Sequence, residues 1–537
     1  MKKFVNLTKN AFIKKASKYI PYLVLISVSL WSIFPIILKP ATSYFKAGDD
    51  GLITWQINQT IQKIPNNLEN IFETNIFYPY KHTLAYTNLA VPSAVIGYLP
   101  VKLTESPFAA YNSVIILTQF LSASFLYLLF KKITQNAWAS VIGSLSLLLS
   151  KFHMQSIAHI HVFMMHWWLI SAYLLWLYKD GKKVKYLYLA ALFFIIQLWE
   201  SFYQAFWIIL FGFLVLTPEF KYLKKQLRHI LFITPAIFVL ASPIFFAYLD
   251  IVRGFGQLTS IRTVSHFSMS FNDIWESNFS LGIYINFILS LVILRKNFLK
   301  NKKLRLPIIL LLLGLILALG PVLKWNGATH KFFGKYFIPL PYTLFYYLIP
   351  GFSALRSVDR FFGISFFSMA MIVAISLTFL PKSKKLLVGL IFFTLSIIGG
   401  KQVDKTHEFP APSSYPKVYS WLENQPGKVI LEYPPYTWID DNYSLEMYRM
   451  VYSLKHHKYL INGASGFMPP ERGKLLSDIK SDLPNNILDQ RLRDLGVDYL
   501  IVHKDETERK KLFNFESDSK LRKIYDDYES AVYSYVK

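Results

Sequence analysis

The sequence contains no cysteine, which excludes a disulfide framework and thiol chemistry. It is also poor in charge: charged residues make up 17% of the 537 positions, whereas hydrophobic residues make up 53%. A soluble protein of this size would be hard to keep in solution with that balance. The sequence has no glycine-rich phosphate loop with a lysine and no Gly-x-Ser-x-Gly elbow, so it gives no support to ATP-driven transport.

Acidic side chains are few, 33 against 58 Lys and Arg, and the formal net charge is therefore +25. Cytoplasmic loops of membrane proteins collect Lys and Arg, so we asked where the surplus lies. Six short segments hold 25 basic residues and only two acidic ones: 1–19, 131–136, 179–185, 217–228, 295–305 and 382–385. The basicity therefore indicates membrane topology, and we predict no nucleic-acid partner.

Apolar blocks alternate with these basic segments, a pattern typical of serial membrane-spanning helices. We predict a mainly α-helical, polytopic membrane protein with about eleven spans, whose N-terminus is cytoplasmic. One pair of spans is a hairpin of short helices that turns at Glu200–Ser201. The predicted spans are Ile20–Leu38, Tyr111–Phe130, Ala137–Leu149, His161–Tyr178, the two arms within Tyr186–Leu216, His229–Leu249, Ile283–Leu294, Leu306–Leu323, Phe361–Leu380 and Leu386–Gly399.

Two other regions complete the predicted organisation. The segment Ala90–Leu103 is apolar but contains two prolines and a glycine, and we interpret it as an interfacial or re-entrant piece. Residues 401–537 have nearly balanced charge and strand-like runs at Lys428–Tyr433 and Val497–His503, with a helix-like stretch between them at Leu483–Leu495. We therefore predict a transmembrane domain over 1–400, with a first outer loop at 39–110, and a small extracytoplasmic α/β domain over 401–537.

The first outer loop contains two adjacent carboxylates, Asp49 and Asp50, between glycines. Next to a bilayer such carboxylates are partly desolvated, which raises a carboxyl pKa and makes the group a better base. The alternative is a solvated turn, because Gly-Asp-Asp-Gly is also ordinary turn chemistry.

The same loop carries the strings NIFYPY and LAYTN, with Tyr78 and Tyr86, and the next span opens with Ala109-Ala110-Tyr111-Asn112. Further strings follow at Ile349–Arg356, Asp359–Phe361, Val429–Pro434, Ile461–Phe467 and Leu495–His503. Together they resemble a widespread group of poorly characterised bacterial membrane proteins that is similar to the GT-C glycosyltransferases. In this sequence Asp49 takes the position of the loop aspartate of that group, whereas Asp50 stands where many relatives have a proline.

The resemblance implies an enzyme that takes a hexosyl or pentosyl unit from a polyprenyl-phosphate carrier and attaches it to an acceptor of the cell envelope, a glycan, lipid or protein, outside the membrane. The implied partners are a polyprenyl-phosphate-linked sugar and membrane lipids. Phosphate is a good leaving group, so one carboxylate that orients or deprotonates the acceptor hydroxyl suffices, whereas glycosidases normally use two. Asp49 and Asp50 are the candidate catalytic residues, and Tyr78 and Tyr86 are candidates for substrate contact.

Other candidate substrate-binding residues lie near the ends of the predicted spans. Four histidines gather around the start of the fourth span, and on a continuous helix His159 and His166 would share a face while His159 and His161 would not. These histidines, His159 and His161 among them, could make interfacial polar contacts, contact substrate or bind a metal. Glu200 lies at the predicted hairpin tip, where it is either simply exposed or functional.

Arg356 and Arg360 precede the tenth predicted span, four residues apart, and on one helical face they would point together. At headgroup depth they could clamp a carrier phosphate, or snorkel to lipid headgroups, or pair with Asp359. The sequence requires no cofactor and leaves a divalent cation open. The competing functions are a carrier or flippase for lipid-linked glycans and a non-catalytic envelope assembly protein. A carrier should show ionisable residues at span centres and repeated halves, and neither is evident here.

Overall fold

The computed structural model describes residues 19–536 except 46–47, 257–258, 276–280, 299, 350, 401–402 and 404–405. The chain forms two compact units. The helical unit combines residues 1–37, 115–242 and 257–404, and the mixed unit combines 38–114, 243–256 and 405–537. The first outer loop and the C-terminal region therefore belong to one unit, although they are far apart in the sequence.

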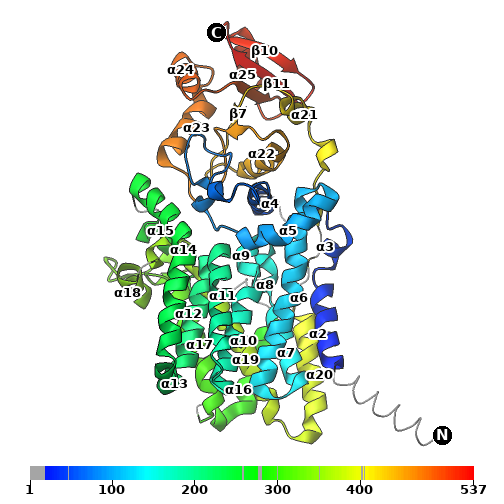
Figure 1. The fold of residues 1–537 in the computed structure, drawn as a ribbon, viewed down its shortest axis with the longest axis vertical. Coiled ribbons are helices and arrows are strands. Elements are labelled where there is room, and N and C mark those ends of the chain that lie inside the picture. The colour runs from blue at the N-terminus through cyan, green and yellow to red at the C-terminus, as the bar shows by residue number, and fades with distance from the viewer. Residues whose placement is uncertain are drawn as a thin grey trace, which may run out of the picture. The chain divides into compact units, whose positions relative to one another are not determined.

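The helical unit is a bundle of long apolar helices that run alongside one another (Figure 1). α19 packs along α17, α7 and α16, and α10 packs along α11 and α12. The helices that contribute to the bundle are α2 (Ile20–Trp31), α6 (Pro107–Thr134), α7 (Ala137–Leu148), α10 (His166–Gly181), α11 (Lys185–Glu200), α12 (Phe202–Leu216), α14 (Leu227–Phe255), α16 (Leu281–Leu294), α17 (Lys302–Ala318), α19 (Phe362–Ser376) and α20 (Lys382–Ile398).

Five helical segments of the described chain are long and apolar enough to cross a membrane: Pro107–Thr134, Ile160–Gly181, Phe202–Lys225, Leu227–Phe255 and Val358–Phe379. Three shorter apolar helices, α2, α7 and α16, accompany them. Each of the eleven predicted spans contains helix, although the helix in Leu306–Leu323 ends at Ala318 and His161–Tyr178 is interrupted at Met164–Met165. The polytopic, mainly helical class is confirmed. The number eleven stays a prediction, because several of these helices are shorter than a bilayer core requires.

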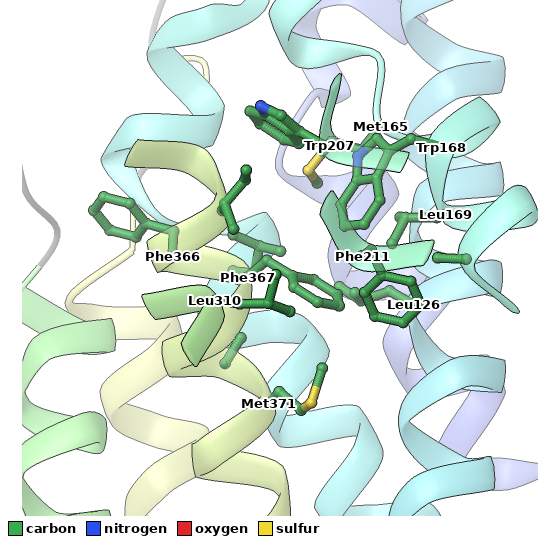
Figure 2. Close-up of a cluster of buried hydrophobic side chains, with 14 of the residues drawn as sticks. Leu126, Met165, Trp168, Leu169, Trp207, Phe211, Leu310, Phe366, Phe367 and Met371 are labelled. Atoms are coloured by element: carbon green, nitrogen blue, oxygen red, sulfur yellow. The ribbon is translucent and has the colours of Figure 1, made fainter. Parts of the chain in front are cut away.

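Aromatic packing forms the centre of this bundle (Figure 2). The ring of Phe367 on α19 contacts Trp168 at a centroid distance of 4.8 Å in an edge-on arrangement, and Phe130 and Phe211 lie at 5.6 and 6.2 Å. Such edge-to-face pairs are favoured because the positive ring edge meets the negative face of its partner. Every residue of α19 is buried, so this helix is the core of the bundle.

The predicted hairpin between α11 and α12 is confirmed. Ser201 is extended, with φ −162° and ψ 137°, and separates the two helices. α11 returns along α10, since the Ser171 hydroxyl donates to the carbonyl of Ala190. α12 then follows the direction of the 160–181 segment, since Gln204 donates to the carbonyl of Val162.

The mixed unit contains a five-stranded sheet in the order β10-β11-β9-β7-β8. β7 (Val429–Tyr433) pairs in parallel with β8 (Tyr459–Leu460) and β9 (Tyr499–His503), which confirms both predicted strands. β10 (Leu521–Asp526) and β11 (Ser530–Tyr535) extend the sheet in antiparallel fashion. The surrounding helices are α21 (Lys417–Glu423), α22 (Tyr443–His456), α23 (Pro470–Asp482), α24 (Asn486–Asp494) and α25 (Arg509–Ser517).

The outer loop packs onto this α/β core as an integral part of it. Backbone hydrogen bonds join Phe77 to Asn462 and Tyr78 to Leu460. α4 (Asp49–Ile61) packs along α22, where a side chain at Gly51 would press on the Met447 carbonyl at 3.3 Å. The predicted interfacial segment forms the helix α5 (Val91–Thr104), which packs against α4.

Candidate functional site

The two predicted catalytic carboxylates lie at the start of α4 and have different surroundings. Gly48 precedes the helix with φ +112°, a conformation that favours glycine. Asp49 is partly exposed, whereas Asp50 is fully buried. The Oδ2 atom of Asp50 accepts a hydrogen bond from the backbone N–H of Phe45 at 2.5 Å. Asp50 thus fixes the turn into α4, whereas the Asp49 carboxylate is the more exposed of the two. Ala47 lies outside the described residues.

Two tyrosines surround the Asp50 carboxylate. The Tyr111 hydroxyl forms a side-chain hydrogen bond with Asp50. Tyr448 on α22 also lies near Asp50, and burial, with Tyr44 nearby, raises the pKa of its phenol well above the ordinary value. The Tyr111 hydroxyl is therefore a hydrogen-bond donor to the Asp50 carboxylate. This polar setting is specified by residues almost 400 positions apart, which no local motif reveals.

The histidines do not share one continuous helix as expected. The short helix α9 (Ile160–Phe163) ends at Met164, and α10 begins afresh at His166. The expectation that His159 and His161 point apart assumed one helix, but His159 precedes α9 with non-helical backbone angles, φ −111° and ψ 71°, and the two ring centroids lie 6.1 Å apart. His166 instead lies against Trp167, at a ring distance of 4.1 Å.

His153, on a short helix before this break, belongs to the structural core. Its Nε2 atom pairs with Gln119 at 3.1 Å, and its ring stacks on Phe163 at 4.4 Å. Burial lowers the pKa of His153 to about 3. Among the described residues, no group of three or more His, Cys, Asp and Glu side chains could hold a metal ion.

The two predicted phosphate-clamp arginines do not lie on one helical face, because Arg356 precedes the short 3-10 helix Val358–Phe361. Both guanidinium groups nevertheless act electrostatically on the His161 ring. The Nη1 atom of Arg360 lies 2.6 Å from the Nε2 atom of His161. Each arginine also faces an aromatic ring, Arg360 at 4.8 Å from Tyr203 and Arg356 at 4.9 Å from Phe267.

The Arg360 contact defines the charge of His161. A guanidinium group has only donors, so the Nε2 atom of His161 must be the acceptor, and the ring proton must then sit on Nδ1. His161 is therefore neutral and cannot be a third cation, nor does it compensate Arg360. Arg360 remains a cation held in place by a neutral ring and an aromatic face.

Sequence reasoning missed a further cation beside Arg356 and Arg360, namely Lys324. Its side chain is buried and donates to the backbone carbonyls of His266 and Ser268 at 3.0 and 2.7 Å. Burial lowers the pKa of Lys324, while Asp273 and Asp359 oppose the shift. Lys324 lies in β2 (Lys324–Trp325), in a loop without a recognisable motif, so no sequence signal would have linked it to Arg360.

Glu200 is not exposed at a hairpin tip: it is the last residue of α11 and is fully buried. The helix corner there is polar, because Gln197 donates both to the Ser201 carbonyl and to the side chain of Gln204. Tyr203, on the same corner, stacks against His161 at 6.4 Å. Glu200 thus belongs to the corner that meets the histidine segment.

The two tyrosines predicted to contact substrate lie in the mixed unit. Tyr78 is half-buried, and its ring lies 5.1 Å from that of Tyr459. Tyr86 is buried between Phe77 and Phe467, at ring distances of 6.3 and 5.3 Å. Burial raises the pKa of the Tyr86 phenol. Their roles in substrate binding stay predictions.

No protein-family model and no curated protein sequence matches this chain. Among solved structures, the chain is similar to the arabinofuranosyltransferase AftD from Mycobacteria, with a TM-score of 0.61 and 13% identity over 96% of this chain and 39% of that one. It is also similar to the oligosaccharyltransferase AglB from Archaeoglobus fulgidus in complex with an inhibitory peptide and a dolichol-phosphate, with a TM-score of 0.49 and 11% identity over 91% of this chain and 70% of that one.

At this level of identity the likeness to AftD is one of fold. The protein has a GT-C-like fold, that of a class of polytopic membrane glycosyltransferases, which confirms the resemblance found in the sequence strings. The chain spans well under half the length of AftD, so the activity of that whole protein is not transferred to this one.

Proposed function

We propose that this protein is a glycosyltransferase that moves a sugar from a polyprenyl-phosphate carrier to an acceptor of the cell envelope outside the cytoplasm. The observation that carries the proposal is the cationic cluster at His161. Arg356 and Arg360 both act on His161, and Lys324 and Arg360 both act on Asp359. Guanidinium groups match the geometry of phosphate oxygens and remain charged beside an apolar bundle.

The proposed roles divide the chemistry between a cation cluster and a carboxylate. Arg356 and Arg360 bind the carrier phosphate, and Asp49 orients the acceptor hydroxyl and accepts its proton. The acceptor oxygen forms a bond to the anomeric carbon, the bond between that carbon and the phosphate oxygen breaks, and the carrier phosphate leaves with the electron pair. The arginines stabilise the charge that grows on the leaving phosphate, which is the kind of electrostatic assistance that lowers a barrier most.

The test is transfer or release of sugar by the purified full-length protein from a panel of polyprenyl-phosphate-linked hexoses and pentoses. Turnover with one donor, lost in Arg360→Gln and retained in Arg509→Gln at an exposed arginine of the mixed unit, supports the proposal. No release from any donor, together with facilitated movement of the donor across vesicle membranes, favours the carrier alternative instead.

The proposed orientation places the N-terminus in the cytoplasm and residues 401–537 outside it. The cysteine-free sequence makes the test direct, since a single introduced cysteine is the only thiol. Cysteines at the exposed positions Ser413 and Ser477 should react with an impermeant thiol reagent in intact cells, whereas one at the exposed Ser383 should not. Labelling of Ser383→Cys with protection of Ser477→Cys would invert the topology.

A further inference from the structure

A buried arginine in the mixed unit has only one acceptor. Arg472 lies in the first turn of α23 and is 3% exposed. Its Nη2 atom donates to the carbonyl of Tyr78 at 2.5 Å. Within the part of the chain that the structure describes, its Nε and Nη1 atoms have no hydrogen-bond partner. The neighbouring groups that act most strongly on its charge are Tyr80, Arg491 and Tyr86, none of which is a carboxylate.

The buried charge of Arg472 destabilises the folded protein unless a further group pairs with it. Burial lowers the pKa of Arg472 to about 10, so the group still carries its charge at neutral pH. A buried charge without a counter-ion destabilises the fold, and proteins normally pair such a group or replace it by an apolar one. Arg472 also sits at the positive end of a 13-residue helix, where a second source of positive potential adds to its own.

The surroundings of Arg472 are aromatic. The guanidinium carbon lies 5.4 Å from the ring centre of Tyr80, whose side chain is partly exposed. The ring of Phe255 lies 5.6 Å from Tyr80 and 5.3 Å from Phe467. Flat aromatic rings stack on the C–H faces of sugars, while a guanidinium group binds carboxylate and phosphate oxygens by paired hydrogen bonds.

We propose that Arg472 and Tyr80 form a binding subsite for a saccharide unit that carries an oxyanion, either a phosphate or a carboxylate. Arg472 binds the anion, and the exposed ring of Tyr80 stacks on the sugar. The identity of that saccharide as a substrate rests on the proposed transferase function, with the anion belonging either to the donor phosphate or to an acidic acceptor sugar. The competing explanation is structural: Arg472 only ties α23 to the Tyr78 carbonyl.

The experiment measures ligand binding to the purified full-length protein, so it does not depend on catalysis. The probes are inorganic phosphate, glucose 1-phosphate, glucuronate and glucose, and the readouts are calorimetric affinity and the shift of the unfolding midpoint. We expect glucose 1-phosphate or glucuronate to bind and to raise the midpoint, and glucose not to. Arg472→Met should weaken that binding roughly 30-fold or more, since it removes one partner of a buried charge pair. Arg509→Met is the matched control and should bind as the parent does.

Four further results distinguish a binding subsite from a purely structural role of Arg472 and identify the ligand. Without ligand, Arg472→Met should unfold at the same midpoint as the parent or above it, because it removes an uncompensated charge; a lower midpoint together with no anion binding by the parent would overturn the proposal. Tyr80→Ala should weaken the binding of the sugar anions but not that of inorganic phosphate. An equal loss of affinity for both would show that the subsite does not bind the sugar. Tighter binding of glucose 1-phosphate assigns the anion to the donor, and tighter binding of glucuronate assigns it to the acceptor. If the protein binds the anion but shows no transferase activity, the subsite is supported while the proposed function fails.

Discussion

Arg449 of the mixed unit and Arg360 of the helical unit are held in opposite ways. In the mixed unit, Arg449 is surrounded by carboxylates: it pairs with Glu446 at 3.0 Å and Glu506 at 2.7 Å, and Glu432 lies at 3.7 Å. Glu432 in turn accepts hydrogen bonds from Tyr419 and pairs with His503, both at 2.8 Å. In the helical unit, Arg360 meets a neutral histidine and an aromatic face instead.

This difference distinguishes charge that holds a fold from charge that is available to a ligand. A network of paired charges is hard to disturb, because removal of one member leaves the others buried and unpaired. A cation without an equivalent anion contributes little to the stability of the fold, but it can bind an anionic substrate strongly. The variants below should therefore separate into stability effects around Arg449 and turnover or affinity effects around Asp49 and Arg360.

The largest effect is expected at Asp49. If Asp49 orients the acceptor and takes its proton, Asp49→Asn should lower turnover by roughly 10²–10⁴ with expression and unfolding midpoint nearly unchanged. The measurement is the initial rate of sugar transfer at saturating donor. Unchanged turnover would remove Asp49 from the mechanism.

Asp50 is the matched comparison, because it is adjacent but buried and bonded to the backbone of Phe45. Asp50→Asn should lower the unfolding midpoint and leave the turnover of the folded fraction within about tenfold of the parent. Equal loss of turnover in both variants would show that the turn into α4, rather than Asp49 itself, is what matters.

Arg449→Met should give the largest loss of stability. It leaves three carboxylates close together in a buried site, which costs about 3–5 kcal/mol. Chemical denaturation of the full-length protein in detergent measures the loss. Arg522→Met, at an exposed position of β10, should change the free energy of unfolding by less than about 0.5 kcal/mol. A small effect of Arg449→Met would mean that the network is not structural and that the contrast between the units fails.

The same network predicts a dependence of stability on pH. Burial raises the pKa of Glu446 from 4.5 to about 7, although Arg449 and two hydrogen bonds oppose the shift. Between about pH 4.5 and 7 the folded protein therefore binds more protons than the unfolded chain, and the free energy of unfolding falls as pH rises, by at most about 3 kcal/mol. Glu432 has the opposite sign: its lowered pKa contributes stability above about pH 4.5 that is lost in stronger acid.

Glu446→Gln tests this because it imitates the protonated carboxyl and keeps the oxygen that accepts from Tyr436 and Asn462. Its denaturation midpoint should lose the slope between pH 4.5 and 7, whereas the exposed Glu423→Gln should keep it. A parent protein whose midpoint is flat over this range would contradict the raised pKa.

Much of the fold could be predicted from the sequence, because runs of apolar residues and basic loops report helices one at a time. The break at Ser201, the strands β7 and β9, and the helical class all follow from such local patterns. The sites could not be predicted in the same way. The neighbours of Asp50 and His161 come from distant segments, and no proline or glycine marks the break at Met164 in the sequence. In the sequence Lys324 and Arg472 are ordinary loop and helix cations, and only their burial in the structure distinguishes them.

The smallest effect, and the one that tests the contrast most finely, is expected for Arg360→Lys. Lysine keeps the positive charge but loses the planar fork, so a phosphate held by paired hydrogen bonds should be held less tightly. Lysine would also lose the planar stacking on Tyr203 and the fixed contact with His161. If Arg360 clamps the carrier phosphate, KM for the lipid-linked donor should rise roughly tenfold, equivalent to about 1.4 kcal/mol, with the unfolding midpoint unchanged. If Arg360 merely reaches for lipid headgroups, lysine should do so equally well, and KM and turnover should match the parent. Arg356→Lys is the paired variant: it too acts on His161, and parent-like kinetics in both would mean that the donor phosphate is held elsewhere.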